Sequence, residues 1–238
     1  VATGNVQNVF VGNEAGSGNT AGVTNTFIGG SAGGANTTGS NNVAVGTTAL
    51  DANTTASENV AVGSNAAGNT TTGGNNIAIG MSALAANTTG NTNVAIGSYA
   101  LDANVAGDRN VAVGEEALSA MNPSGNVDTY NTAIGYNAGI STTTGVSGTF
   151  CGAAAGAGVT TGNRNTFLGH GCGYTTTTGQ NNIMIGYHAR ASASTTHNEL
   201  VISGESGVGK GQSTGFISPG GGGVAITFAD SGVFISTT

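Results

Sequence analysis

The sequence is poor in the residues on which most globular domains depend. Of its 238 residues none is Trp, two are Pro, two are Cys, and only 6% are charged. Ordinary globular chains carry about 25% charged residues and about 7% Gly. The two cysteines occupy unlike positions of the repeat described below, so we predict no disulfide framework.

Basic residues are especially scarce. The chain has 4 Lys and Arg against 11 Asp and Glu, which gives a formal net charge of −7. Without a basic patch there is no electrostatic footprint for nucleic acid or for an anionic membrane surface. No apolar run approaches the roughly 20 residues of a membrane-spanning helix, and no signal peptide is recognisable. We therefore predict no nucleic-acid partner and no membrane insertion.

What the chain has instead is a repeat. The pentapeptide Asn-Val-Ala-Val-Gly at residues 42–46 returns in variant form every 17 residues, and its last residue is called the motif glycine below. A twelfth copy ends in Ser203. Low charge with abundant Gly, Thr and Asn is also typical of disorder, but disorder does not hold a register, whereas a repeat architecture does. The motif glycines are Gly12, Gly29, Gly46, Gly63, Gly80, Gly97, Gly114, Gly135, Gly152, Gly169 and Gly186.

Three neighbouring positions of the motif are apolar. The residues three and one before the motif glycine are mostly β-branched, which favours a strand, and they share one face. The residue between them, Ala or Phe in most copies, faces the other way. A strand that is apolar on both faces must be covered on both. A coiled chain has only one inside, so we predict an all-β fold: a parallel β-solenoid (β-roll) of about twelve 17-residue turns over residues 1–204, assembled as a homotrimer. Which face is intrachain stays open.

Large and small residues alternate between two positions of each repeat. Where the middle residue is Phe, as in Phe27, the residue four after the motif glycine is Gly, as in Gly33. Where it is Ala, as in Ala78, that residue is usually Leu, as in Leu84. Conservation of core volume predicts that the two positions share a pocket. Ala78→Phe alone should then destabilise the fold, and Leu84→Gly beside it should partly restore stability.

Polar residues mark the rest of each repeat. Gly seven before the motif glycine, together with Asn, is expected to supply corners with positive φ. The Asn that opens the motif is expected to stack in a hydrogen-bonded ladder. Four extra residues between Gly114 and Gly135 fall within 119–130 and predict a surface loop. Residues 205–223 are interpreted as a degenerate Gly-rich turn and hinge. Residues 224–238 predict a β-hairpin cap with strands at 224–228 and 233–235.

The repeat resembles known fibre families. The Asn-Val-Ala-Ile-Gly core at 93–97 resembles the head repeats of trimeric autotransporter adhesins, and this implies a left-handed parallel β-roll with three chains around one axis. The longer unit, with Ala-Leu after the motif glycine and Asn-Thr-Thr-Gly at the turn, is similar to repeats of bacteriophage tail-fibre proteins and related bacterial surface fibres. The resemblance covers about residues 1–204. It implies a virion tail fibre or another extracellular, cell-surface location.

One segment matches a nucleotide-binding pattern in part. Residues 204–211, Gly-Glu-Ser-Gly-Val-Gly-Lys-Gly, fit a phosphate loop through the Lys, but Gly211 stands where Ser or Thr should bind magnesium. No helix is expected to follow, so a Gly-rich turn is the preferred interpretation.

Other candidate chemistry is weak. His170, His188 and His197 occupy different repeat positions without a completing Cys or carboxylate set, although a trimer axis would gather three copies of any one of them. Glu115 and Glu116 are adjacent and should point to opposite faces, unlike the facing acids of a depolymerising enzyme. We predict no enzyme, no catalytic or metal-binding residues and no cofactor.

These observations predict a structural and adhesive fibre segment, similar to a phage tail fibre, that presents a receptor-binding surface to a cell-surface glycan or protein. One alternative is the head of a bacterial trimeric surface adhesin. An alternative of another class is a monomeric ice- or glycan-binding solenoid, which the repeated Thr-Thr-Thr-Gly turns suggest. The candidate receptor contacts are Tyr99, Met121, Tyr130, Tyr136 and Tyr187.

Overall fold

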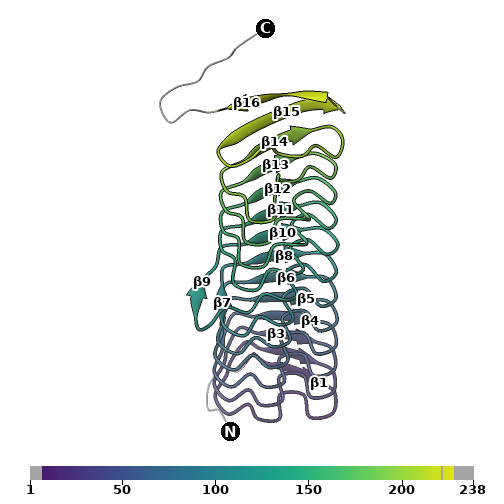
Figure 1. The fold of residues 1–238 in the computed structure, drawn as a ribbon. Helices are drawn as coiled ribbons and strands as arrows, with labels where there is room; N and C mark the ends of the chain where they lie inside the picture. The colour runs from purple at the N-terminus through teal and green to yellow at the C-terminus, as the bar shows by residue number, and fades with distance from the viewer. Residues whose placement is uncertain (1–6, 221, 228–238) are drawn as a thin grey trace. The chain divides into compact units, whose positions relative to one another are not determined.

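The protein is described here by a computed structural model, which covers residues 7–220 and 222–227. The chain divides into two compact units, Val1–Tyr130 and Asn131–Thr238, called unit 1 and unit 2 below. The described residues contain strands and turns and no helix (Figure 1). Each repeat motif forms a strand of three or four residues, as β-branched residues on both sides of the middle position favour.

Unit 1 is a parallel β-solenoid whose turns place one motif strand beside the next. Successive strands pair in parallel with a shift of one repeat, so that Ala44 lies opposite Ala61. The motif strands are β1 (Val9–Val11), β2 (Thr26–Ile28), β3 (Val43–Val45), β4 (Val60–Val62), β5 (Ile77–Ile79), β6 (Val94–Ile96) and β8 (Val111–Val113). Two further short strands, β7 (Gly107–Asp108) and β9 (Val127–Asp128), pair in parallel with each other.

Unit 2 repeats this arrangement and then changes it. Its motif strands, paired in parallel, are β10 (Thr132–Ile134), β11 (Thr149–Cys151), β12 (Thr166–Leu168), β13 (Ile183–Ile185) and β14 (Leu200–Ser203). Seven motif strands in unit 1 and five in unit 2 confirm the predicted parallel β-solenoid of about twelve turns.

The C-terminal strands differ from the expected hinge, and β16 overlaps the first strand expected for the cap. β15 (Thr214–Gly220) pairs in parallel with β14, and β16 (Gly222–Thr227) pairs antiparallel with β15. The expected hinge at 205–223 thus contains a strand. The second strand of the expected hairpin, 233–235, lies outside the described residues, so a cap over 224–238 stays a prediction.

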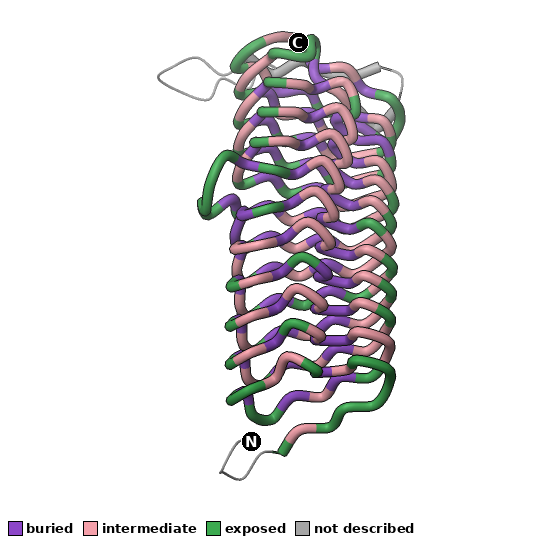
Figure 2. The backbone as a smooth tube through the Cα atoms, turned by 90° about the horizontal axis from the view of Figure 1, so that it is seen from below, coloured by how far each residue is buried: buried purple, intermediate pink, exposed green. Residues whose placement is uncertain are grey.

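The middle residue of each motif strand points into the solenoid. Ala44 and Ala61 in unit 1 and Phe150 and Phe167 in unit 2 have no exposed surface. The residues on either side of them are partly or fully exposed. Figure 2 shows this alternation as buried positions that recur at the same place in successive turns. The structure therefore identifies the middle position as the intrachain face, which the sequence left open.

The shared pocket is confirmed. A methyl group on Gly33 would lie 2.5 Å from Cε2 of Phe27, so a larger residue does not fit beside the ring. Leu84 occupies the repeat position of Gly33 in the turn of Ala78, and both Leu84 and Ala78 are fully buried. Neighbouring Phe turns also stack, with 5.1 Å between the ring centroids of Phe10 and Phe27.

The expected corners with positive φ are confirmed at Asn, as at Asn41, but not at the glycine seven before the motif glycine. Gly39, seven before a motif glycine, does not have a positive φ. Glycine is required at this position because a methyl group would collide with the carbonyl oxygen of Ala56 in the next turn. Left-handed corners lie instead five before, two after and four after the motif glycine, as at Asn41 (φ 59), Thr48 (φ 55) and Leu50 (φ 50). Each such residue costs about 1–2 kcal/mol, which hydrogen bonds to neighbouring turns must offset.

Asparagine ladders supply some of these bonds. The Asn42 amide N–H donates to Oδ1 of Asn25 at 2.9 Å, and its Nδ2 donates to the Ala56 carbonyl at 2.8 Å, which confirms the expected ladder. A second ladder was not predicted: Nδ2 of Asn53 donates to Oδ1 of Asn36 at 2.8 Å. All these side chains are fully buried. Their amides therefore satisfy buried backbone groups that would otherwise destabilise the coil.

Candidate functional site

The most extensive candidate surface is the outer sheet face, defined as the residues one and three before each motif glycine. None of these residues is charged. In unit 1, Val9 is 51% and Val11 56% exposed; in unit 2, Leu168 is 46% and Ile183 45% exposed. Exposed apolar side chains that recur along one face are typical of an interaction site. The prediction that the second apolar face lacks an intrachain cover is thus confirmed in each unit.

One cysteine lies on this face. Cys151 is partly exposed in β11, in register between Ile134 of β10 and Leu168 of β12. Cys172 is buried and its thiol donates to the Met184 carbonyl at 3.0 Å. Burial raises the pKa of the Cys172 thiol to about 12, which keeps it protonated and unreactive. The two thiols therefore differ in chemical accessibility.

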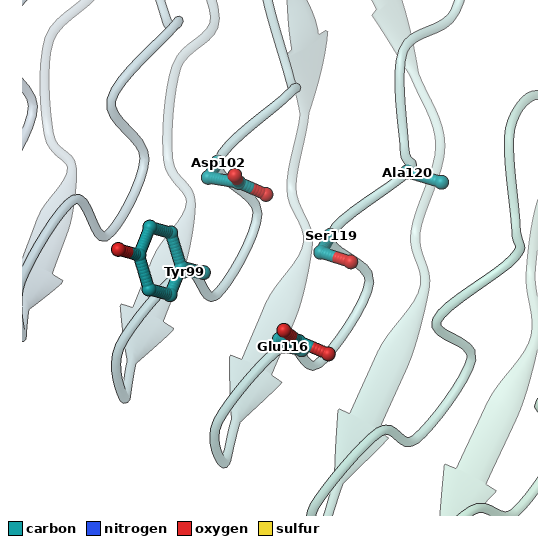
Figure 3. A pocket seen from close by; sticks show the side chains of 5 residues that line it. All are labelled: Tyr99, Asp102, Glu116, Ser119 and Ala120. Atoms are coloured by element: carbon teal, nitrogen blue, oxygen red, sulfur yellow. The ribbon is translucent and has the colours of Figure 1, made fainter.

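The predicted contact Tyr99 lines a shallow depression of about 270 Å³ in unit 1. One turn supplies Tyr99 and Asp102, and the next supplies Glu116, Ser119 and Ala120 (Figure 3). The phenol, the carboxylates and the hydroxyl all accept hydrogen bonds, so the depression suits a ligand that bears hydroxyl or amine groups.

Electrostatics in the depression favour a proton on one acid. Partial burial raises the pKa of the Asp102 carboxyl, and the negative charge of Glu116 adds to the increase. The backbone N–H groups of Asp102 and Ala103 oppose it. Sequence reasoning missed this pairing, although a signal existed: Tyr99 and Glu116 both lie two residues after a motif glycine, and Asp102 and Ser119 both lie five after.

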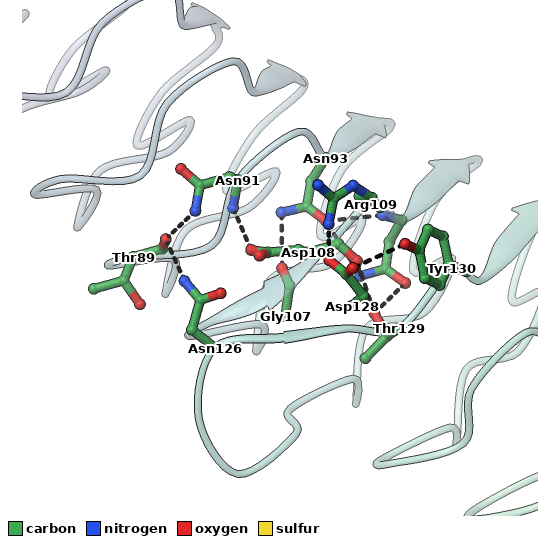
Figure 4. Close-up of polar contacts among 11 residues, drawn as sticks. Thr89, Asn91, Asn93, Gly107, Asp108, Arg109, Asn126, Asp128, Thr129 and Tyr130 are labelled. Carbon is green, nitrogen blue, oxygen red and sulfur yellow. Dashed lines mark hydrogen bonds and ion pairs between the residues drawn. The ribbon is translucent and has the colours of Figure 1, made fainter.

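The inserted loop holds Tyr130 at the surface of unit 1. Arg109 forms an ion pair with Asp128, and the Tyr130 hydroxyl donates to Oδ2 of Asp128 at 2.8 Å (Figure 4). The Arg109 guanidinium carbon lies 5.8 Å from the centroid of the Tyr130 ring, within the range of a cation–π contact. Nδ2 of Asn126 donates to the Thr89 carbonyl. Tyr130 is 53% exposed and oriented by this network.

One predicted contact is wrong. Met121 has no exposed surface, so it cannot touch a receptor. It lies seven residues after Gly114, at the repeat position where Asn53 follows Gly46 and belongs to the second ladder. The surface part of the insertion therefore begins after Met121.

The remaining predicted contacts lie in unit 2. Tyr136 is 56% and Tyr187 54% exposed. The ring of Tyr187 contacts those of His170 and His188, whereas no ring contact is found for Tyr136 among the described residues. The structure thus brings two of the three histidines together with Tyr187, an association that their different repeat positions concealed.

The phosphate-loop-like segment encloses a carboxylate of the protein itself. The Gly211 N–H donates to Oε1 of Glu199 at 2.6 Å, and the Ser192 N–H donates to Oε2 at 2.9 Å. A methyl group on Gly209 would collide with the same carboxylate. Glu199 is 1% exposed. Backbone N–H groups of Gly-rich turns bind anions, and here the anion is an internal side chain.

Within residues 7–220 and 222–227, no three His, Cys, Asp or Glu residues are grouped so that they could hold a metal ion. The described part of the chain also contains no helix capable of crossing a membrane. Comparisons of the chain with known protein families, with curated proteins and with solved structures found no match.

Proposed function

We propose that the chain is a segment of an attachment fibre, carried by a virion tail or a cell surface, that associates as a homotrimer and presents side chains to a cell-surface glycan or protein. The observation that carries the proposal is the outer sheet face. It is uncharged in every turn and mostly Val, Ile or Leu, with Thr in four turns, while the interior of each unit is already filled. The resemblance of the repeat to tail-fibre and adhesin repeats supports the same role.

The energetics favour a repeating partner. Burying the exposed half of one Val or Ile is worth on the order of 1 kcal/mol. Most turns offer two aliphatic positions on this face, although Thr replaces one of them in four turns (Thr26, Thr132, Thr149 and Thr166). The gain therefore accumulates along each unit. A surface that repeats with the period of the chain is matched most simply by copies of the same chain, and closed symmetry is the common outcome of such association.

Cys151 provides a test that leaves the sequence of the face intact. The protein is treated with a short bismaleimide or a mild oxidant and run on a non-reducing denaturing gel, while light scattering gives the mass of the untreated protein. We expect a mass of three 22.7 kDa chains, with crosslinked species that Cys151→Ser abolishes. Cys172→Ser is the matched control and should leave crosslinking unchanged because that thiol is buried.

A charged residue on the face tests its role in assembly. Ile183→Lys should give a folded protein of lower mass, because Ile183 is 45% exposed in the single chain and would be covered in the trimer. Thr38→Lys, at an exposed corner away from the motif strands, should remain trimeric. A single-chain mass for the unmodified protein, or a trimer unaffected by Ile183→Lys, would contradict the proposal.

The ice-binding alternative requires threonine hydroxyls that face water. Oγ1 of Thr37 donates instead to the Thr54 carbonyl at 2.8 Å, and Oγ1 of Thr71 to the Thr88 carbonyl at 3.0 Å. These hydroxyls already have partners in the neighbouring turn. We therefore favour the fibre, and absence of thermal hysteresis in solution is the expected result.

A further inference from the structure

Aromatic and imidazole rings gather on the surface of unit 2. Tyr187 and His188 lie 4.4 Å apart between ring centroids, Tyr187 and His170 5.4 Å, and Tyr174 and His188 5.4 Å. Nη1 of Arg190 donates to the Tyr174 hydroxyl at 3.0 Å. These five residues are called the ring cluster. They come from two successive turns, and the contacts join them into one group.

The ring cluster is not part of the core. Tyr187 is 54% and Tyr174 37% exposed, whereas Phe150 and Phe167 inside the same unit are fully buried. The fold does not need rings at these positions. The residue after the motif glycine is Tyr187 here but Thr47, Ser64 and Ser98 in turns of unit 1 that also form a three-residue motif strand. The exposed rings are thus not required for the fold.

The charge of the ring cluster is positive. Among the described residues Arg190 has no carboxylate within ion-pair distance. The ion pair that the described residues do form, between Arg109 and Asp128, lies in unit 1. The described carboxylates of unit 2 are Glu199, which is enclosed by backbone N–H groups, and the exposed Glu205. The guanidinium therefore keeps donor capacity beyond its bond to Tyr174, since it carries five N–H groups in a planar fork.

We propose that the ring cluster binds a carboxylated saccharide. The exposed rings offer apolar faces to the C–H side of a pyranose, and the phenol and imidazole groups offer hydrogen-bond partners for its hydroxyls. The guanidinium of Arg190 matches a carboxylate, which it binds through two parallel N–H···O bonds. A polynucleotide is disfavoured because its affinity depends on many basic residues, and the whole chain has 4 Lys and Arg. This inference rests on the proposed function, because it names the class of surface glycan that the fibre would bind.

The experiment compares two probes that differ in the carboxylate alone: methyl β-D-glucuronide and methyl β-D-glucoside. Binding to the full chain is measured by saturation-transfer NMR and by chemical-shift titration of the histidine and tyrosine ring protons. We expect the glucuronide to bind at least ten times more tightly than the glucoside. Arg190→Gln should remove that preference, and Tyr187→Ser should weaken both probes at least tenfold.

Met81→Ser is the matched control. Met81 lies one residue after its motif glycine like Tyr187 and is 46% exposed, but it carries no ring and lies outside the ring cluster. Its loss should leave both affinities unchanged. Equal binding of the two probes, no binding of the glucuronide, or an equal effect of Met81→Ser would each overturn the proposal. Light scattering of the same samples reports the trimer separately, so a failed saccharide site is distinguishable from a failed fibre assignment.

Discussion

The pocket shared by two positions of each turn supports a double-mutant test at the edge of the Phe-containing turns. Ala44 lies opposite Phe27 in the pairing of β2 with β3, and Leu50 fills the rest of the pocket in its turn. Ala44→Phe combined with Leu50→Gly would convert this turn to the Phe-with-Gly type and extend the stack of Phe10 and Phe27. The expected result is that each single change is costly and the pair much less so.

The structure sets the magnitudes. Removing the buried Leu50 side chain costs about 2–5 kcal/mol, of which about 1 kcal/mol returns because Gly is at ease at φ 50. Adding a ring at Ala44 beside an intact Leu50 overpacks the pocket and costs about 1–3 kcal/mol or more. With both changes the introduced ring occupies the vacated space, so we expect a favourable coupling of at least about 2 kcal/mol, within the range seen for residues in contact.

The assay is guanidinium unfolding of the four proteins at one protein concentration, because association shifts apparent stability. Midpoints are compared together with slopes, since repeat arrays can depart from two-state behaviour. The control pairs Leu50→Gly with Ala112→Phe, a change in β8 that is four turns away and should show no coupling. An additive matched pair, or equal coupling in the mismatched pair, would show that the pocket is not shared.

Three further changes have expected outcomes. Gly80→Ala should cost more than about 3 kcal/mol in thermal unfolding, because φ is +132° and the methyl group would lie 2.6 Å from the next turn's carbonyl oxygen; Gly30→Ala, with its nearest neighbour atom at 4.0 Å, should be tolerated. Asp102→Asn should stabilise the protein at pH 7 and not at pH 3. Because the folded-state pKa of Asp102 is raised, the unmodified protein loses stability as the pH rises through that pKa. Below the unfolded-state pKa, the Asp102 carboxyl and the amide that replaces it are both neutral, so the substitution gives no gain. Glu199→Gln should speed tryptic cleavage after Lys210, the chain's single lysine, several-fold. The Glu199 carboxylate accepts N–H bonds from Ser192 and Gly211, and an amide nitrogen cannot accept one of them. The control Glu205→Gln, at an exposed residue, should leave the cleavage rate unchanged.

The sequence predicted the parts of the fold that every turn repeats. Ala78 with Leu84 and Phe27 with Gly33 could be paired because each turn meets the same neighbours, so one position is observed many times. The outward direction of Val43 and Val45 followed from strand periodicity once the middle residue was known to face inward. Side-chain volume and side-chain direction are local properties. They can be inferred from a repeat sequence because the same position occurs in every turn.

What the sequence did not show depends on contacts between turns. The glycine at Gly39 is required by the carbonyl of the next turn rather than by its own φ, and composition alone does not separate these two causes. The insertion conceals that Met121 occupies the repeat position of the second ladder, so the sequence predicts it at the surface although it is buried. The depression at Tyr99 needed the knowledge that positions two and five after the motif glycine converge across adjacent turns.

The outward positions divide into two kinds, and the division bears on recognition. The outer sheet face is uncharged throughout and holds Val, Ile, Leu, Thr or Cys alone. The positions after the motif glycine carry acids and Tyr in unit 1 but His, Tyr and Arg in unit 2. Residues 1–130 hold eight Asp and Glu and one Arg, a net charge of −7, while residues 131–238 hold three of each sign and are neutral. Since these side chains lie outside the core, a turn can exchange its chemistry at little cost in stability, so each unit can present a different ligand preference on the same fold.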